Sequence, residues 1–320
     1  MIIVTGGAGM IGSNIVFALN KMGINNIIIV DNLRNGRKFI NLKDLDFQDY
    51  FDKENFLNLI KSNYDFGKIE VIFHQGACSS TTEWDGKYLM NNNYEYSKQL
   101  LNWAQDIKAQ FIFASSASVY GLGKNGFQES PKCENPINPY AYSKFFFDQY
   151  LRRIILKKQS QIVSLRYFNV YGPREQHKGS MASTIFHFHN QIKQSNFCKL
   201  FEGTDGYLNG EQMRDFVYVD DCVDINLWFM QNPQKSGIFN VGTGNPEKFN
   251  NLADHIIDWH KKNKNIEASI KYVKFPSELK GFYQNFTMAD ISSLRNIGYK
   301  KEFTSLKLGI NNYLRWLEQQ

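Results

Sequence analysis

The residues best suited to proton transfer lie in two short strings near the middle of the chain, at positions 115–121 and 140–144. Tyr140 and Lys144 are four residues apart, so on a helix they share one face and lie one turn apart. An ammonium group beside a phenol stabilises the phenolate and lowers the pKa of the phenol. We therefore expect Tyr140 to exchange a proton with a substrate hydroxyl, with Lys144 as its charge partner. Ser116, at the end of a strand-like run, is placed to hydrogen-bond the same substrate oxygen.

A glycine-rich string at residues 6–12 predicts the cofactor that this proton transfer would accompany. Gly6, Gly9 and Gly12 follow a strand-like run and open a helical pattern. Glycine permits a tight turn close to a pyrophosphate, and the helix N-terminus supplies free N–H groups and the positive end of a dipole. Asp31 ends the next strand-like run about twenty residues later, as in dinucleotide sites. The combination predicts hydride transfer with a nicotinamide cofactor.

The residues that follow this second run leave the choice of nicotinamide cofactor open. Asp31 can accept a hydrogen bond from the adenosine ribose, which favours NAD. Asn32 is followed by the cations Arg34, Arg37 and Lys38, which could instead pair with the 2′-phosphate of NADP. From charge alone, both cofactors remain possible.

The elements that must position these residues alternate between strands and helices. Short runs rich in branched or aromatic residues predict strands buried on both faces, at 2–5, 27–31, 71–75, 111–115 and 162–168. Amphipathic patterns between them predict helices at 11–22, 93–107 and 140–156. This β–α repetition predicts a Rossmann-type α/β fold, with a doubly wound parallel sheet.

The alternation fades after a Gly-Pro step at 172–173. We read 216–219 and 238–241 as strands that return to the sheet region, and 269–273 as a further short strand. We therefore expect a nucleotide-binding domain at 1–170, rejoined by about 216–245. Residues 171–215 and 246–320 would form a smaller mixed α/β domain that binds the substrate.

Composition narrows the class of protein. The 320 residues carry 37 Lys and Arg against 31 Asp and Glu, a net charge of +6, and 15% of them are aromatic. Plentiful aromatic residues exclude a disordered chain, and no apolar run approaches the ~18–20 residues of a membrane span. There is no basic stripe typical of nucleic-acid binding. The four scattered cysteines predict neither a metal site nor disulfides, and the strand-like N-terminus leaves no signal peptide, so we expect a cytoplasmic protein.

Three longer strings carry a resemblance to a known family, at residues 75–86, 166–174 and 177–183. With the motifs above, they make the whole chain similar to the extended short-chain dehydrogenases/reductases. Within that group it most resembles the ADP-L-glycero-D-manno-heptose 6-epimerases. The string at 166–174 is common to many nucleotide-sugar enzymes, whereas Gly76-Ala77-Cys78-Ser79-Ser80-Thr81-Thr82-Glu83 and His177-Lys178-Gly179-Ser180-Met181-Ala182-Ser183 are more specific.

The resemblance implies a tightly bound NADP rather than NAD, and it assigns residues to each half of the site. The implied cofactor contacts, beyond the three glycines, are Met10, Ile11, Asp31, Asn32, Lys38, Lys53, Gln75, Gly76, Ala77, Cys78, Ser79, Asn92, Lys144, Val170 and Lys178. The implied substrate contacts are Asn169, Ser180, His187, Phe201, Glu202, Gly203, Thr204, Arg214 and Tyr283. Arg214 suits a diphosphate because its planar fork matches phosphate oxygens, although a salt bridge with Asp215 is the alternative. The family often has Glu where Gln75 stands, and the stretch before Arg214 is longer than its pattern.

The same resemblance gives the reaction that we expect. Oxidation at C6″ of ADP-D-glycero-D-manno-heptose gives a 6″-ketone, and its reduction from the other face gives the L-glycero epimer for the lipopolysaccharide inner core. Tyr140 would serve one epimer, and Lys178, otherwise an ordinary loop lysine, would serve the other. The resemblance also implies a homopentamer. Alternatives are another nucleotide-sugar epimerase, such as a UDP-hexose 4-epimerase, or a non-catalytic NADP-sensing protein on the same fold. A sugar 4,6-dehydratase would need an acidic residue where Ala117 and Ser118 stand.

Overall fold

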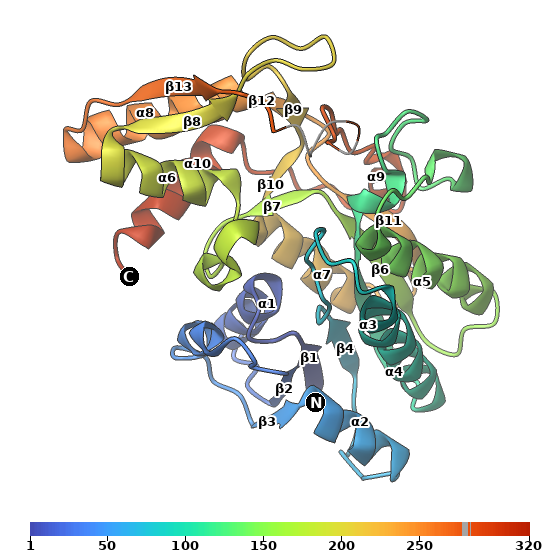
Figure 1. Ribbon diagram of the computed structural model, residues 1–320. Coiled ribbons are helices and arrows are strands. Elements are labelled where there is room, and N and C mark those ends of the chain that lie inside the picture. Colours follow the sequence, from blue (N-terminus) through green and yellow to red (C-terminus); the bar gives the residue numbers. More distant parts are fainter. Residues whose placement is uncertain (277–280, 282) are drawn as a thin grey trace.

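A seven-stranded parallel sheet forms the centre of the molecule (Figure 1). The computed structural model describes residues 1–276, 281 and 283–320. The strand order is β11-β6-β5-β4-β1-β2-β3, and every neighbouring pair is parallel. The strands are β1 (Ile2–Thr5), β2 (Ile27–Asp31), β3 (Asp49–Asp52), β4 (Val71–His74), β5 (Gln110–Ser116), β6 (Ile162–Tyr167) and β11 (Gly237–Val241).

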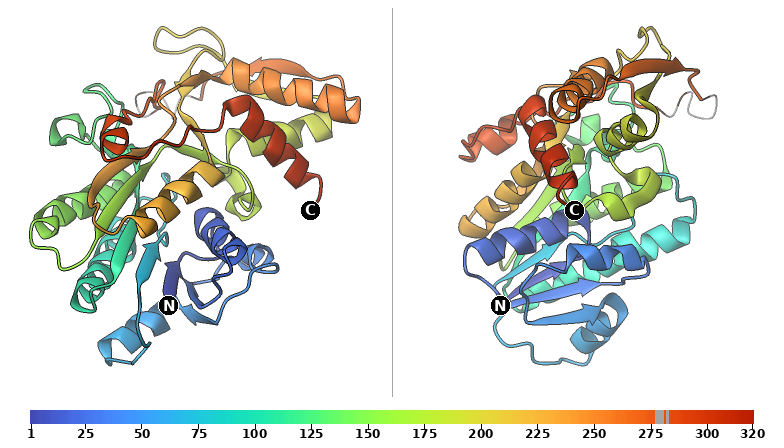
Figure 2. Two further views of the ribbon diagram at one scale, coloured as in Figure 1. Left: turned by 180° about the vertical axis from the view of Figure 1, so that it is seen from behind. Right: turned by 90° about the vertical axis from the view of Figure 1, so that its left-hand side faces the viewer.

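Helices cover both faces of this sheet, as the apolar strands require (Figure 2). Successive strand residues point to opposite faces, so Ile2 and Val4 pack in one hydrophobic cluster and Ile3 in another. The first cluster joins the sheet to α1 (Met10–Lys21), α7 (Val219–Gln231) and α9 (Ser292–Asn296). The second joins it to α2 (Lys53–Lys61), α4 (Tyr96–Asp106) and α5 (Pro139–Ile155). This is the doubly wound arrangement predicted from the sequence.

A group of C-terminal elements with its own hydrophobic cluster lies beyond the ends of the sheet strands (Figure 1). Its helices are α6 (Thr184–Ser195), α8 (Phe249–Lys264) and α10 (Leu306–Leu317), beside the parallel pair β8 (Phe197–Phe201) and β13 (Ser269–Val273). Two small sheets connect it to the main sheet: β7 (Asn169–Tyr171) pairs with β10 (Phe216–Tyr218), and β9 (Met213–Arg214) pairs with β12 (Glu247–Lys248).

Shorter elements line the loops. They are α3 (Gly86–Leu89), which continues through a π-helical turn (Met90–Glu95) into α4, and 3₁₀ turns at Gly36–Asn41, Ala117–Tyr120, Pro131–Cys133 and Gln176–Met181. None of the described helices is long and apolar enough to cross a membrane.

The structure corrects three expectations about the elements. Residues 216–218 form a strand, but they pair with β7 in a separate small sheet and not with the main sheet. The strands β3 and β8 were not predicted: β3 is a half-exposed edge strand with aspartates at both ends, whereas β8 alternates around Lys199, a strand pattern that could have been used. The helix expected at 93–107 begins earlier, since the chain already coils from Gly86.

Candidate active site

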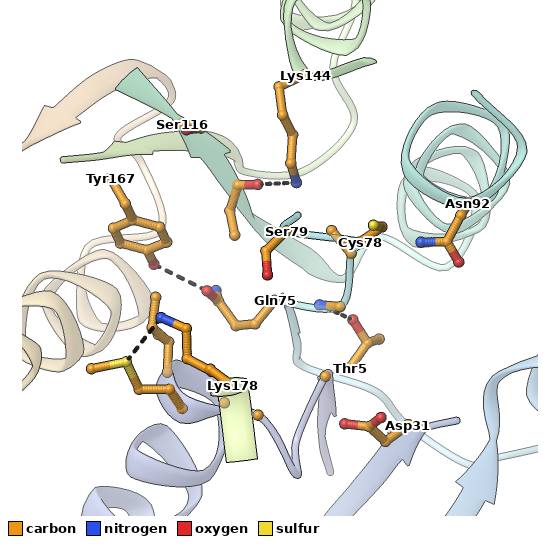
Figure 3. Close-up of a pocket in the computed structure, with 18 of the residues that line it drawn as sticks. Thr5, Asp31, Gln75, Cys78, Ser79, Asn92, Ser116, Lys144, Tyr167 and Lys178 are labelled. Carbon is orange, nitrogen blue, oxygen red and sulfur yellow. Dashed lines mark hydrogen bonds between the residues drawn. The ribbon is translucent and has the colours of Figure 1, made fainter. Parts of the chain in front are cut away.

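A cavity of about 390 Å³ opens at the carboxyl ends of the central strands. Ligands of open α/β sheets bind at this edge, where the strand order reverses. Every residue predicted for catalysis or cofactor binding lines this cavity, although the residues come from nine separate segments of the chain. Figure 3 shows Ser116 and Lys144 on one side of it and Lys178 on the other. The predicted substrate residues are not among those that line it.

The glycine turn at the start of α1 is packed so closely that larger residues do not fit. Gly6 has φ +65°, and a Cβ there would lie 2.6 Å from the backbone nitrogen of Gly76. A Cβ on Gly12 would lie 2.2 Å from the carbonyl oxygen of Gly6. Gly9 is the N-cap of α1 and offers no side-chain cap, so the first N–H groups of this helix are available to an anion. These features fit the pyrophosphate of a dinucleotide.

The Asp31 carboxylate at the end of β2 is held by backbone N–H groups and by a lysine. Oδ2 accepts from the backbone N–H of Ala8 at 3.1 Å, and Oδ1 from that of Asn32 at 2.7 Å. The ammonium of Lys38 lies 2.8 Å from Oδ1. This part of the cavity therefore contains a buried anion paired with a half-buried cation, a charge arrangement that suits a ribose hydroxyl and leaves Lys38 within reach of a phosphate on it.

Two further predicted cofactor residues contact each other on the next segments. Lys53, in the first turn of α2, donates to Oδ1 of Asn92 at 2.5 Å. Burial lowers the pKa of Lys53. Asn93, the next residue, holds the Cys78 backbone on both sides, accepting from its N–H at 2.8 Å and donating to its carbonyl at 3.0 Å. The segment 76–79 is therefore held by hydrogen bonds to the helical segment that follows it.

Ser116, Tyr140 and Lys144 come together at the end of β5 and the start of α5. Asn138 caps α5 through the N–H of Ala141. The ammonium of Lys144 donates to the carbonyl oxygen of Ala114 at 2.7 Å (Figure 3). Burial raises the pKa of Tyr140, and a hydrogen bond with Ser116 opposes that rise. We had expected Lys144 to lower the pKa of Tyr140; in this structure the direction is upward, because the phenol is buried and the lysine is directed at the strand.

A buried carboxylate lies one turn beyond Lys144 on the same helix. Asp148 accepts from the hydroxyls of Ser115 at 3.0 Å and Ser164 at 2.7 Å, and from Nε of Arg166 at 2.9 Å. Burial lowers the pKa of Lys144 to about 8, and the charge of Asp148 opposes that change. Asp148 therefore ties α5 to β5 and β6 and favours the charged form of the lysine.

Lys178 lies in the 3₁₀ turn Gln176–Met181, on another wall of the cavity. Its ammonium is 4.0 Å from Sδ of Met10 in α1 and 3.9 Å from the buried carboxylate of Glu175. Lys178 keeps about a quarter of its side chain exposed. The Lys178 side chain therefore contacts the protein on one side and is open to the cavity on the other.

Gln75 takes part in a closed ring of three hydrogen bonds. Its Nε2 donates to Oδ1 of Asn226 at 3.2 Å, and its Oε1 accepts from the hydroxyl of Tyr167 at 3.1 Å. Nδ2 of Asn226 donates to the same hydroxyl at 2.7 Å. A glutamate at position 75 could not donate to Asn226. Glutamine in place of the glutamate that the family often has at position 75 therefore matches the acceptor that Asn226 offers in this fold.

The predicted substrate residues fall into three groups outside the cavity lining. Phe201, at the end of β8, and Arg214, in β9, both contact Tyr283: the ring centroids of Phe201 and Tyr283 are 6.2 Å apart, and the guanidinium lies 4.7 Å from the Tyr283 centroid. Glu202, Gly203 and Thr204 follow Phe201, and the N–H of Gly203 is held by Oδ1 of Asn209 at 2.8 Å. His187 contacts the carbonyl oxygen of Ser180 at 3.3 Å. Asn169 is exposed at the start of β7.

Arg214 is a buried cation with 6% of its surface exposed. It forms no ion pair with a carboxylate among the described residues. The alternative salt bridge with Asp215 does not form, because that carboxylate accepts from the backbone N–H groups of Thr243, Gly244 and Ala289. Burial lowers the pKa of Arg214, and Tyr283 opposes this. A buried guanidinium with no carboxylate partner in the part of the chain that the structure describes is a good site for an anionic ligand.

Sequence reasoning missed several residues of the cavity wall, among them Thr5, Tyr88, Tyr96, Tyr167 and His177. Burial and the neighbouring cations Lys38 and Lys178 lower the pKa of His177 to about 4, so it is neutral near pH 7. A signal was available for two of them. Tyr167 ends a predicted strand at the edge where ligands bind, and His177 directly precedes Lys178. Over 1–276, 281 and 283–320, no cluster of three metal-ligating side chains is found.

Comparisons with known proteins agree with this geometry. A profile of the "NAD dependent epimerase/dehydratase family" matches residues 2–242. The structure is similar to the ADP-L-glycero-D-manno-heptose-6-epimerase of Helicobacter pylori, with a TM-score of 0.82, 31% identity, and coverage of 100% of this chain and 96% of that one. It is also similar to a UDP-N-acetylglucosamine 4-epimerase of Methanobrevibacter ruminantium (TM-score 0.83, 28% identity, coverage 100% and 98%). A UDP-glucuronic acid 4-epimerase of Bacillus cereus, in complex with UDP-glucuronic acid and NAD, has a TM-score of 0.78 at 26% identity, with coverage of 99% of both chains. The match over residues 2–242 places this chain in the NAD dependent epimerase/dehydratase family.

Proposed function

We propose that this protein is an ADP-L-glycero-D-manno-heptose 6-epimerase. The observation that carries the proposal is that Tyr140 and Lys178, two groups able to move protons, line one cavity from different elements, together with the glycine turn and Asp31. An epimerase that works through a ketone must handle the same hydroxyl in two orientations. One proton-transfer group on each side meets that requirement, whereas a simple dehydrogenase needs only one.

In this proposal each residue has a defined task. A nicotinamide cofactor bound in the cavity supplies the hydride chemistry at C6″. Tyr140 accepts the proton of the hydroxyl in one epimer and Lys178 returns a proton to the oxygen in the other. Ser116 orients the oxygen, and Lys144 provides positive charge for the phenolate of Tyr140 once it turns from Ala114.

We assign the nucleotide diphosphate of the substrate to Arg214, because it is buried without a carboxylate partner among the described residues. Tyr283 and Phe201 pack around it. Asn169, Ser180, His187 and residues 202–204 would complete the sugar and base contacts. The division into a cofactor domain at 1–170 and 216–245 and a substrate domain at 171–215 and 246–320 belongs to the same proposal.

We further propose NADP as the cofactor, since Lys38 lies at the Asp31 carboxylate where a 2′-phosphate would be placed. A cytoplasmic homopentamer that acts in lipopolysaccharide inner-core synthesis follows from the resemblance of the strings at 75–86 and 177–183. A UDP-hexose 4-epimerase is the second candidate, and the similarity to UDP-sugar 4-epimerases at nearly the same TM-score supports it.

The test is incubation of the purified protein, without added cofactor, with ADP-D-glycero-D-manno-heptose and in parallel with UDP-glucose and UDP-N-acetylglucosamine. NMR in deuterated water follows inversion at each carbon. We expect inversion at C6″ of the ADP-heptose, with no solvent deuterium at that carbon because the hydride stays in the site. Inversion at C4″ of a UDP-sugar would favour the second candidate, and deuterium at C6″ would replace the redox route with a carbanion route.

A further inference from the structure

The turn that carries Lys178 is anchored on two sides by consecutive buried residues of opposite charge. Arg174, with φ +71°, donates to the carbonyl oxygen of Asn41 at 2.7 Å and forms a two-pronged pair with Asp44 at 3.0 and 2.7 Å. Glu175 points toward the C-terminal elements instead. The backbone between β7 and the Lys178 turn is therefore fixed to both parts of the molecule.

Glu175 has no exposed side chain, and its carboxylate is held by the start of α6. Its Oε2 accepts from the backbone N–H of Ser183 at 2.6 Å, and its Oε1 accepts from the Ser183 hydroxyl at 2.6 Å. Ser183 is also the N-cap of α6. The Lys178 ammonium lies 3.9 Å from Oε2, the same oxygen that accepts from the Ser183 N–H.

The other charged and titratable groups around Lys178 do not duplicate this role. His177 is neutral near pH 7, and the cations Lys38 and Lys178 both act on it. Asp31, from β2, is already paired with Lys38. On the far side of Glu175, burial and that carboxylate raise the pKa of Tyr313 in α10, so the phenol stays neutral. Among the described residues, Glu175 is thus the carboxylate within 4.0 Å of the Lys178 ammonium.

We propose that Glu175 is a positioning residue whose charge holds the Lys178 ammonium at the cavity wall. The importance of this role for the reaction rests on the proposed function, whereas the contact between Glu175 and Lys178 does not. An opposite charge at this distance stabilises the ammonium. A buried carboxylate with fixed hydrogen bonds also limits the positions that the lysine can take.

The test measures the lysine directly and needs no substrate. Lysines are reductively methylated with ¹³C-formaldehyde, and the signal of Lys178 is assigned by its loss in Lys178→Arg. Glu175→Gln keeps the shape and can still bond to Ser183, but it removes the charge. We expect the Lys178 signal to lose its nuclear Overhauser contact with the Met10 methyl group and to move toward the chemical shift of an unrestrained lysine, because the charge that attracts the ammonium to this wall is gone. The control Ser183→Ala removes one hydrogen bond and keeps the charge, so its Lys178 signal should stay in place.

An unchanged Lys178 signal in folded Glu175→Gln would overturn the proposal, and so would equal signal changes in Glu175→Gln and Ser183→Ala, which would indicate a purely structural anchor. If Glu175→Gln does not fold, Glu175→Asp withdraws the carboxylate by one methylene and should give a smaller change of the Lys178 signal in the same direction; no change in that variant overturns the proposal equally. Because none of these readouts uses epimerisation, they remain valid even if ADP-heptose is not the substrate.

Discussion

The two walls of the cavity carry similar chemistry on very different supports. Tyr140 and Lys144 lie in the first turns of the seventeen-residue helix α5, packed against the sheet. Lys178 lies in a six-residue 3₁₀ turn that is interrupted by Gly179 with φ +57°. The wall formed by α5 and the sheet is named the sheet wall, and the wall formed by the Lys178 turn is named the loop wall. Behind each lysine lies a buried carboxylate, Asp148 on the sheet wall and Glu175 on the loop wall.

The difference indicates which half of the site is pre-organised and which half is shaped by contacts far along the chain. Lys144 is buried, and its charge is balanced by a network that spans α5, β5 and β6. Lys178 is held at the junction of α1, α6 and its own turn. A fixed phenol and a more exposed lysine suit a reaction in which the substrate, between two half-reactions, presents its other face.

The largest expected effects come from removing the proton-transfer group of either wall. Tyr140→Phe keeps the ring and Lys178→Met keeps the stem, while each removes the ionisable group. General acid–base residues contribute ~10²–10⁴-fold in rate, so we expect each variant to lose at least about a hundredfold in epimerisation. Cofactor affinity, measured by fluorescence titration, should stay measurable in both. A Lys178→Met enzyme with near-wild-type turnover would reduce the loop wall to a structural element.

A somewhat smaller effect is expected at the adenosine end of the cavity, where Lys38 pairs with Asp31. Lys38→Ala removes the cation beside Asp31 and leaves a carboxylate facing a 2′-phosphate. A hydrogen-bonded charge pair contributes on the order of 1–3 kcal/mol, or roughly one to two decades in affinity. The wild type should bind NADP more tightly than NAD in calorimetry after the bound cofactor is removed, and Lys38→Ala should narrow that gap. Equal wild-type affinity for both cofactors would contradict the assignment.

Gln75→Glu tests whether the ring of Gln75, Asn226 and Tyr167 requires a neutral amide. The carboxylate cannot donate to Asn226, and an unsatisfied buried acceptor costs about 1–3 kcal/mol. We expect a lower midpoint in chemical denaturation with an unchanged slope, and weaker cofactor binding. Gln319→Glu, at an exposed position, controls for the added charge. If both variants are equally stable, the ring is not what selects glutamine at this position.

The smallest effect on the reaction itself is expected from a histidine pair in the helices behind the loop wall, which acts on stability. His189 in α6 and His260 in α8 contact each other at 3.0 Å, with Glu318, Lys193 and Lys264 around them. Burial is the first cause that lowers the pKa of each to about 4 from 6.5. The unfolded chain therefore binds these protons below about pH 6.5 while the folded one does not. The free energy of unfolding should fall between pH 6.5 and 4, by on the order of 1 kcal/mol per histidine and pH unit.

Urea denaturation at pH 7 and pH 5 measures this loss. The double variant His189→Gln/His260→Gln should show a flatter dependence on pH than the wild type. His74, whose pKa is lowered to about 3, and His177 contribute the remaining slope in both proteins. A double variant with the same slope as the wild type would show that the pair does not carry the dependence.

The sheet wall could be predicted from the sequence far better than the loop wall. Strand 2–5, the glycine turn and Asp31 follow from local patterns with a physical reason, and the helix that carries Tyr140 and Lys144 follows from its spacing. Lys178 has no such pattern, and only the resemblance singled it out. The direction of the pKa of Tyr140 could not be predicted either, because it depends on burial and on where Lys144 points, which are set by packing.

The substrate residues show the same limit from another side. Tyr283 lies about seventy to eighty residues after Phe201 and Arg214, and its contact with them depends on the small sheets that join the C-terminal elements. Spacing along the chain therefore does not predict these contacts. His177 lines the cavity beside Lys178. It belongs to the string at 177–183, but no sequence pattern of its own singles it out.

The most direct test of the central claim, that the two walls serve opposite faces of the substrate, uses half-reactions with the 6″-ketone of the ADP-heptose, whose reduction creates a stereocentre at C6″. Single-turnover reduction is followed in Tyr140→Phe and in Lys178→Met, and the product stereochemistry at C6″ is read by NMR. The account predicts that each variant keeps reduction to one epimer and loses at least about a hundredfold for the other, with opposite preferences. Loss of both epimers to the same extent in Lys178→Met, with Tyr140→Phe inactive on both, would contradict it and leave Tyr140 as the one proton-transfer group.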